Sequence, residues 1–328
     1  MGGSGGGRLD APEPASRGGD AASVEGGRHR GRPGPRDRLI TALVAVAGLV
    51  AAVLGVAIGG AAWTANDYGS EIGRLPDVFP SGDRPPSAPG SLTFLVVGVE
   101  PSEDAPSGAV AQSLVLVRVT GDRKGVQMVF LPPDLQEGTA DGAGSSLEDA
   151  FDTGGPQRLV GAVESLTGVR INHVGLLDLA GFESMADALG GVTVDVPEPY
   201  RNGDHYFPAG RQQLDGAAAL AYMRDRGGSE ARSGTAVRQQ RMVRALWERV
   251  SEQGALSDLG RLTGTLESLT RSLRVDETLG NPDLVSLAWE LRGVGSPQFV
   301  TAPTDGRAAS LWAYLRTDSL RDHLDEFR

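Results

Sequence analysis

Arginines gather in one stretch of the second half of the chain. They are Arg224, Arg226, Arg232, Arg238, Arg241 and Arg244, and they follow a run of small residues that starts at Asp215. The chain as a whole is acidic, with a formal net charge of −11. Because a guanidinium group can hold two phosphate oxygens at once, the cluster indicates an anionic and in particular a phosphorylated ligand. The alternative is a solvated surface on which these arginines pair with Asp225 and Glu230.

Other reactive side chains form weaker patterns. The histidines are far apart in the sequence and lack the spacing of metal ligands; they are His29, His173, His205 and His323. The chain contains no cysteine, which excludes disulfides and thiolate chemistry. Asp134 and Asp149 are carboxylates that could serve as a general base, with a solvated loop carboxylate as the alternative.

Length and composition bound the class of protein. The 328 residues suffice for one domain of about 200 to 240 residues with appendages. Hydrophobic residues make up 40% of the chain and supply a sizeable core. The negative net charge argues against nucleic acid as the main partner, because binding to a phosphate backbone requires a basic surface.

A long uncharged segment runs from Leu39 to Trp63. At 1.5 Å per residue, a helix of this length spans the roughly 30 Å hydrocarbon core of a bilayer with some tilt. Arginines precede the segment, whereas Asp67 and Glu71 follow it, so the positive-inside rule places the N-terminus in the cytoplasm. We expect an uncleaved single-pass anchor in the cell membrane; a cleaved signal peptide is the alternative.

Composition divides the chain around this segment. Residues 1–38 contain few large apolar side chains and are expected to form a disordered cytoplasmic tail. Residues 39–63 are the expected transmembrane helix. Residues 64–90 end in SGDRPPSAPG and are expected to form a Pro/Gly-rich linker. The extracellular domain should then occupy residues 91–328.

Strand-like and helix-like segments alternate in this domain. Short apolar runs over 91–99, 113–120 and 125–132 predict strands, the first of them buried on both faces. A helix is expected from Pro156 to Gly168, and a further strand over 171–179. A helix over 180–191 and a strand over 192–197 follow. Further helices are expected over 236–254, 257–274 and 283–292, with a late strand from Pro297 and a last helix over 318–327. The pattern predicts an α/β layered domain.

The arginine stretch also resembles a known family. LDGAAALAYMRDR, a Gly/Ser loop and RQQ are similar to the arginine segment of the LytR-CpsA-Psr family, and LVVGVE and LEDAFDTGG extend the similarity over residues 91–328. The resemblance implies an α-β-α domain with a central mixed sheet that transfers glycopolymers from a polyprenyl pyrophosphate carrier onto peptidoglycan. It also implies a hydrophobic tunnel for the lipid tail, with ordinary core packing as the alternative for each candidate lining residue: Leu176, Phe182, Met185, Leu189 and Met223.

The resemblance assigns roles to individual residues. Arg224, Arg226 and Arg238 match the family's pyrophosphate-binding arginines. Glu100 stands where an aspartate ends the first strand and is the candidate ligand for Mg²⁺. Asp134, which matches the aspartate after the third strand, is the candidate catalytic base.

Several positions depart from the family pattern. Val110, Gln112 and Pro133 replace an arginine, a metal-binding aspartate and another arginine, while Ser146 and Thr235 replace a lysine and an arginine. Valine and proline cannot donate to a phosphate, and each preorganised donor that is lost costs about a hundredfold or more in rate.

Two functions therefore remain open. The first is a membrane-anchored glycopolymer phosphotransferase, and the second is a non-catalytic protein that binds the lipid carrier on the same fold. A transcriptional regulator fits poorly, because the cytoplasmic tail has no recognisable DNA-binding fold. The Ala/Gly/Arg-rich composition suggests an actinobacterial source.

Overall fold

The computed structural model describes residues 72–136, 144–202, 204–224, 233–252, 272–280, 283, 286 and 296–327. The expected tail over 1–38, the expected transmembrane helix over 39–63, and Arg226 and Arg232 lie outside the described residues. So do most of the helices expected over 257–274 and 283–292. Within the described ranges, no helix is long and apolar enough to cross a membrane.

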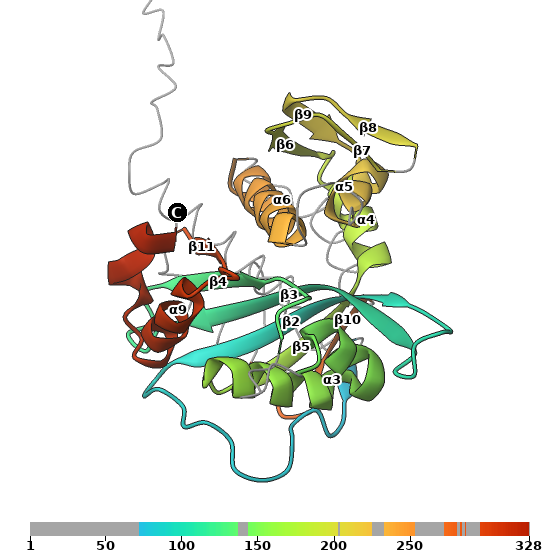
Figure 1. Cartoon of the computed structure of the whole chain (residues 1–328). Coiled ribbons are helices and arrows are strands. Elements are labelled where there is room, and N and C mark those ends of the chain that lie inside the picture. The colour runs from blue at the N-terminus through green and yellow to red at the C-terminus, as the bar shows by residue number, and fades with distance from the viewer. Residues whose placement is uncertain are drawn as a thin grey trace, which may run out of the picture.

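A seven-stranded mixed sheet forms the centre of the domain (Figure 1). Its order is β1-β10-β5-β2-β3-β4-β11. The strands are β1 (Gly73–Leu75), β2 (Leu92–Pro101), β3 (Ala109–Val119), β4 (Val126–Leu131), β5 (His173–Asp178), β10 (Leu273–Asp276) and β11 (Gln298–Thr301). The neighbours β2, β3 and β4 are antiparallel, while β5 runs parallel to β2 and β11 runs parallel to β4.

Both faces of the central strands are buried. Along β2, Phe94 and Val96 enter one hydrophobic core, while Leu95 and Val97 enter a second core on the opposite face. Successive side chains of a strand point to opposite faces, so a strand covered on both sides reads as a continuous apolar run. This is the pattern that the sequence shows over residues 91–99.

Helices cover the two faces as separate layers (Figure 1). The first core contains α4 (Leu179–Ala188), α5 (Gly216–Arg224) and α6 (Ser233–Glu252). The second contains α3 (Leu147–Thr167), α9 (Arg307–Arg316) and part of the 3₁₀ helix η2 (Leu320–Phe327). The predicted α-β-α arrangement around a mixed sheet is confirmed.

Helix α3 begins nine residues before the expected start at Pro156. Ser146 caps its first turn by accepting a bond from the Asp149 amide, and the Asp149 carboxylate bonds back to Ser146. This reciprocal capping stabilises the earlier start. Gly155 then kinks the helix with a φ of 62°, which explains why the sequence pattern reads as helical only from Pro156.

Two small antiparallel pairs lie beyond α5 and α6 (Figure 1). Strands β6 (Val192–Val196) and β9 (Gly210–Leu214) form one pair, and β7 (Tyr200–Asn202) and β8 (His205–Phe207) form the other. Only the first of these strands was predicted from the sequence.

The folded domain begins earlier than the expected boundary at residue 91. Gly73–Leu75 pairs with β10 at the edge of the sheet, and Leu75 and Val78 are buried in the second core. The later part of this segment is also attached, because Arg84 reaches α3. Residues 72–90 therefore belong to the domain, which corrects the linker assigned to 64–90. The proline-rich composition correctly indicated an extended chain. It did not indicate that side-chain contacts fix this chain to the domain.

A buried ion pair holds this segment. The Arg84 guanidinium donates to both carboxylate oxygens of Glu164 at 2.9 and 2.7 Å and to the carbonyl of Ile171 at 2.7 Å. The side chains of Arg84 and Glu164 are only 10% and 3% exposed. Glu164 also accepts from the Ile171 amide at 2.7 Å. The segment before the sheet is thus joined to the end of α3 through one carboxylate.

We expect Arg84→Ala to lower the free energy of unfolding by about 3–5 kcal/mol, because it leaves the buried Glu164 carboxylate without its partner. Chemical denaturation of the full-length chain measures this. The exposed pair of Arg307 with Asp305 supplies the control, since Arg307→Ala should change the midpoint little. A midpoint for Arg84→Ala equal to that of the control would contradict the role assigned to the buried pair.

Candidate functional site

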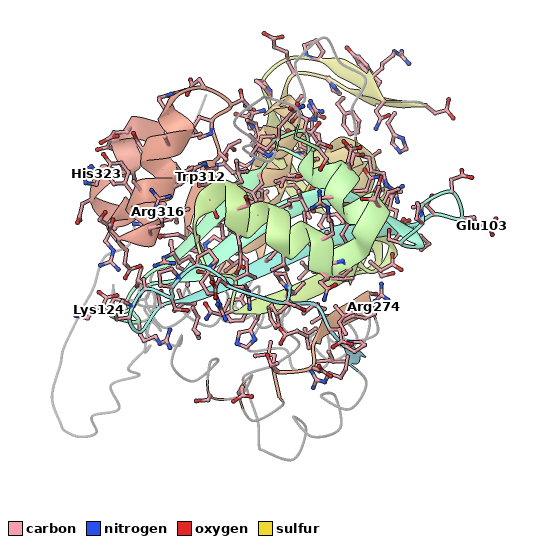
Figure 2. The ribbon with its side chains drawn as sticks, turned by 60° about the horizontal axis from the view of Figure 1, so that its bottom comes forward. Glu103, Lys124, Arg274, Trp312, Arg316 and His323 are labelled. Carbon is pink, nitrogen blue, oxygen red and sulfur yellow. The ribbon has the colours of Figure 1, made fainter. Side chains whose placement is uncertain are left out.

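The candidate site lies at one edge of the central sheet. Strands β2, β4, β5 and β11 all end at this edge, and β3 starts there. Figure 2 shows Glu103, in the loop from β2 to β3, and Lys124, in the turn from β3 to β4, at opposite ends of the molecule. Ligands of open α/β sheets bind outside the carboxyl ends of the strands. Glu100, near the end of β2, is therefore well placed for a ligand.

A β-bulge shapes this edge. Gly98 pairs with Ser113 and Val99 pairs with Ala111, so Gln112 is the extra residue on β3. Bulges are frequent beside active sites, where they redirect side chains. The Gln112 carbonyl accepts a hydrogen bond of 2.7 Å from the Gln239 side chain, which ties α6 to the bulge.

Glu100 and Arg224 form an ion pair across the site. Glu100 is near the end of β2 and Arg224 is the last residue of α5, so the contact joins the sheet to the helical layer above it. The side chain of Arg224 is 42% exposed and that of Glu100 23%. The pair is thus open to solvent and to a ligand.

Arg238 occupies a more enclosed position on α6. The residue is only 7% exposed, and its guanidinium donates to the Thr235 hydroxyl at 3.2 Å. Thr235 stands where the family pattern has a further arginine, so the two positions interact directly. Arg238 also lies close enough to the buried Tyr222 of α5 to influence its ionisation. Arg224 and Arg238, predicted as partners, thus lie on the neighbouring helices α5 and α6.

The Tyr222 hydroxyl is part of this arrangement. Burial raises its pKa above the ordinary value of 10, and the hydrogen bond and positive charge of Arg241, with the charge of Arg238, offset only part of that effect. The phenol therefore stays neutral beside two guanidinium groups. A neutral hydroxyl can accept from an arginine without cancelling its charge.

An apolar cavity of about 80 Å³ lies between the sheet and the layer of α4, α5 and α6. The residues that line it come from the sheet and from α4, α5 and α6: Val96, Gly98, Ser113, Val115, Val117, Met128, Leu177, Leu179, Phe182, Met185, Met223, Val243 and Leu246. Gly98 precedes Glu100 by two positions, and Met223 precedes Arg224 directly. Glu100 and Arg224 are thus close in sequence to lining residues of the cavity, although their own side chains do not line it.

Three of the five predicted tunnel residues line this cavity. They are Phe182, Met185 and Met223. Leu176 belongs instead to the core on the other face of the sheet, and Leu189 packs at the margin of the first core. The error at Leu176 follows from strand alternation, because its neighbour Leu177 faces the cavity.

Asp134 follows the end of β4 in a turn. The Leu135 amide bonds to the Pro132 carbonyl, and the Glu148 amide bonds to the Pro133 carbonyl, so the turn is fixed on the first residues of α3. The Asp134 Oδ1 atom is buried and has no hydrogen-bond partner among the described residues. Asp134 is thus at the same edge of the sheet as Glu100, two strands away in the sheet order.

The residues at Glu100 do not fit a Mg²⁺ ion. Arg224 already neutralises the carboxylate, and Val110, directly opposite Glu100 on β3, offers no oxygen ligand. Asp178 pairs with Val99 and therefore faces the other side of the sheet. Among the described residues, no three His, Asp or Glu side chains come together as a metal site.

The fold and the site define a class: an α-β-α protein with an apolar cavity between sheet and helices and an arginine–glutamate ion pair near the carboxyl edge of the sheet. The chain belongs to the LytR_cpsA_psr family, whose model matches residues 76–321. This matched range starts before residue 91, as the folded domain does.

Relatives of known sequence support the family assignment. The cell wall biosynthesis protein LcpA of Corynebacterium glutamicum is 34% identical over 166 residues, which are 48% of this chain and 31% of LcpA. The chain thus spans about a third of the length of LcpA. A polyisoprenyl-teichoic acid–peptidoglycan teichoic acid transferase, TagU of Halalkalibacterium halodurans, is 26% identical over 76% of this chain and 83% of TagU.

Solved structures share the fold. The LytR-Csp2A-Psr enzyme from Actinomyces oris matches with a TM-score of 0.59 at 22% identity, over 75% of this chain and 96% of that chain. TagT bound to LIIa-WTA matches with a TM-score of 0.52 at 20% identity, over 72% of this chain and 96% of TagT.

Sequence reasoning missed two contributors to the site. Gln239 was read only as part of the RQQ motif, and Tyr222 only as part of the AYMRDR run. The RQQ motif was a signal for Gln239, because three consecutive polar residues within a helix cannot all face solvent when the helix packs on a sheet. The bulge at Gln112 left no signal in the sequence.

The shifted pKa of Tyr222 predicts how stability depends on pH. A phenol whose pKa is raised by folding contributes its full stabilisation below the ordinary pKa of 10 and loses it as the pH rises through the folded-state value. The difference in unfolding free energy between the wild type and Tyr222→Phe should therefore be constant up to about pH 10 and change above it. Denaturation at a series of pH values tests this. The 55% exposed Tyr206 provides the control, and an equal pH response of Tyr206→Phe would refute the assignment.

Proposed function

We propose that the protein acts in cell-wall biogenesis by binding a polyprenyl-pyrophosphate-linked glycopolymer and transferring it to peptidoglycan. The observation that carries the proposal is that the neighbouring helices α5 and α6 carry Arg224 and Arg238 and also line an apolar cavity. Such a site offers cations to a pyrophosphate and an apolar space to a lipid tail. Relatives such as TagU carry the corresponding transferase names.

Arginine supplies the positive charge in this proposal. Arg224 and Arg238, with Arg226 from outside the described residues, would bind the phosphate oxygens in bidentate fashion. The exposed guanidinium of Arg224 can leave Glu100 for a ligand at little cost, because an open ion pair contributes little to stability. Arg238 is held by Thr235 and is preorganised.

The transfer step needs an acceptor hydroxyl and a base. The hydroxyl oxygen attacks the phosphorus nearer the glycopolymer, the bond from that phosphorus to the bridging oxygen breaks, and polyprenyl phosphate leaves with the electron pair. The hydroxyl proton passes to a carboxylate, for which we propose Asp134 because its Oδ1 is buried without a partner among the described residues.

The proposal includes the topology expected from the sequence. Residues 39–63 would anchor the chain in the cell membrane, with the N-terminus in the cytoplasm and the folded domain outside. This arrangement puts the apolar cavity on the side of the membrane where peptidoglycan is found.

A second candidate function is a non-catalytic protein that binds or delivers the lipid carrier. Val110 opposite Glu100, and Pro133 beside Asp134, favour it, because neither side chain can donate to a phosphate. The cavity and the arginines would serve both functions. A measurement of catalytic turnover distinguishes the two functions.

The first prediction concerns binding. Arg224→Ala and Arg238→Ala should each weaken the binding of farnesyl pyrophosphate to the full-length chain by about tenfold or more, since each removes charge-assisted hydrogen bonds. Isothermal titration in detergent measures this. Arg274→Ala is the control, because Arg274 lies on β10 between Leu273 and Val275 of the first core and so points to the face of the sheet opposite the cavity (Figure 2). Affinity should be the same in Mg²⁺ and in EDTA. Affinity that collapses in EDTA would show that a metal, rather than Arg224, neutralises Glu100.

The second prediction concerns turnover. The combined variant Val110→Arg, Gln112→Asp and Pro133→Arg should release polyprenyl phosphate from a lipid-linked glycan at least about a hundredfold faster than the wild type, because preorganised cations lower the barrier. Release of lipid phosphate in the presence of peptidoglycan is the readout. Slow but measurable release by the wild type, abolished by Asp134→Asn, supports a transferase. Release only by the combined variant supports the carrier-binding function.

A further inference from the structure

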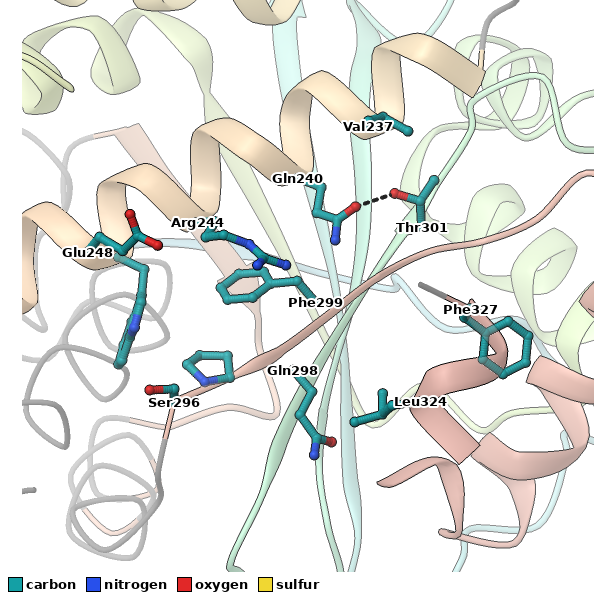
Figure 3. A pocket seen from close by; sticks show the side chains of 12 residues that line it. Val237, Gln240, Arg244, Glu248, Ser296, Gln298, Phe299, Thr301, Leu324 and Phe327 are labelled. Carbon is teal, nitrogen blue, oxygen red and sulfur yellow. Dashed lines mark hydrogen bonds between the residues drawn. The ribbon is translucent and has the colours of Figure 1, made fainter. Parts of the chain in front are cut away.

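A groove runs along the outer side of α6, away from the apolar cavity (Figure 3). It encloses about 800 Å³, within the roughly 300–1,000 Å³ of ligand sites. One wall is α6, the floor is β11, and the opposite wall is η2, which contributes Leu324 and Phe327.

The lining offers both polar groups and ring faces. The Thr301 hydroxyl donates to the Gln240 Oε1 at 2.6 Å, so the Gln240 amide nitrogen is presented to the groove (Figure 3). The Arg244 guanidinium lies over the Phe299 ring at 5.0 Å. Planar polar side chains beside aromatic rings suit a ligand with many hydroxyl groups and apolar C–H faces.

The charge of the groove is balanced. Its lining contains one cation, Arg244, and one carboxylate, Glu248. The site at Glu100, by contrast, gathers several arginines. An anionic polymer would gain little from this balanced lining, whereas a neutral sugar chain would find donors and acceptors without a net charge to oppose it.

The groove and the cavity share α6 as a common wall. Val243 and Leu246 face the cavity, whereas Gln240 and Arg244 face the groove. The groove also reaches the carboxyl edge of the sheet, because Thr301 is the last residue of β11 and pairs with Phe130 of β4. Asp134 follows β4 at that edge, between the end of β2 and the end of β11 in the sheet order.

This placement matches the geometry of phosphoryl transfer. The attacking oxygen and the leaving oxygen lie roughly in line on opposite sides of the phosphorus. If the lipid phosphate leaves from the cavity side of α6, the acceptor hydroxyl must approach from the other side, where the groove ends.

We propose that the groove between α6, β11 and η2 binds the acceptor, a neutral hydroxyl-rich glycan strand of the cell wall, and directs its hydroxyl to the edge at Asp134. The inference rests on the proposed function for the identity of the donor. The glycan-binding groove itself depends only on its own lining residues.

The test measures binding of a soluble tetramer of β-1,4-linked N-acetylglucosamine to the full-length chain. Isothermal titration is done in a detergent without a sugar headgroup, which would compete. Gln240→Ala and Arg244→Ala should each lower the affinity for the tetramer at least about tenfold and leave the affinity for farnesyl pyrophosphate unchanged. Arg274→Ala is the control and should alter neither ligand. Unchanged melting temperatures show that the variants are folded.

The outcomes separate this inference from the proposed function. Arg224→Ala should lower the affinity for farnesyl pyrophosphate but not the affinity for the tetramer. If the lipid ligand fails to bind while the tetramer depends on Gln240 and Arg244, the glycan groove stands and the proposed function fails. Three outcomes would overturn the assignment of the groove. They are a wild type that does not bind the tetramer, Gln240→Ala and Arg244→Ala variants that bind it as tightly as the wild type, and loss of lipid binding on Arg244→Ala.

Discussion

Burial of the central sheet on both faces is the constraint from which the rest of the structure follows. Phe94 and Val96 need one helical layer, and Leu95 and Val97 need another. The layer of α4, α5 and α6 does not close completely on the sheet, and the space that remains is the apolar cavity. Two of the helices that enclose it, α5 and α6, also carry Arg224 and Arg238, so the packing of the core fixes the positions of both arginines.

The two arginines are held in different ways, which fits different roles. Arg238 is buried and is bonded to Thr235, so its position is set before a ligand arrives. Arg224 is nearly half exposed and is paired with Glu100, so it can exchange one oxygen partner for another. A fixed cation gives orientation, and a partly exposed cation can turn toward the oxygens of an entering pyrophosphate.

Three substitutions of this chain, Val110, Gln112 and Pro133, lie at strand ends, whereas Ser146 caps α3 and Thr235 belongs to α6. Val110 and Gln112 lie opposite and beside Glu100, and the bulge presents the Gln112 carbonyl to Gln239. The Arg224 guanidinium lies against the Glu100 carboxylate and neutralises it. On the far side of α6, a groove with balanced charge reaches the same edge, so that one helix separates an apolar substrate space from a polar one.

Sequence by itself determined the α/β class, the strands with continuous apolar runs and the arginine cluster, because each depends on local composition and periodicity. It also indicated three cavity residues, Phe182, Met185 and Met223. Tertiary structure alone decided that residues 72–90 join the domain, because this depends on Arg84 meeting Glu164 across 80 positions. It likewise decided that Arg224 pairs with Glu100, because residues distant in sequence meet only when the layers pack. The same packing fixes the register of β5, and with it that Leu177 rather than Leu176 faces the cavity.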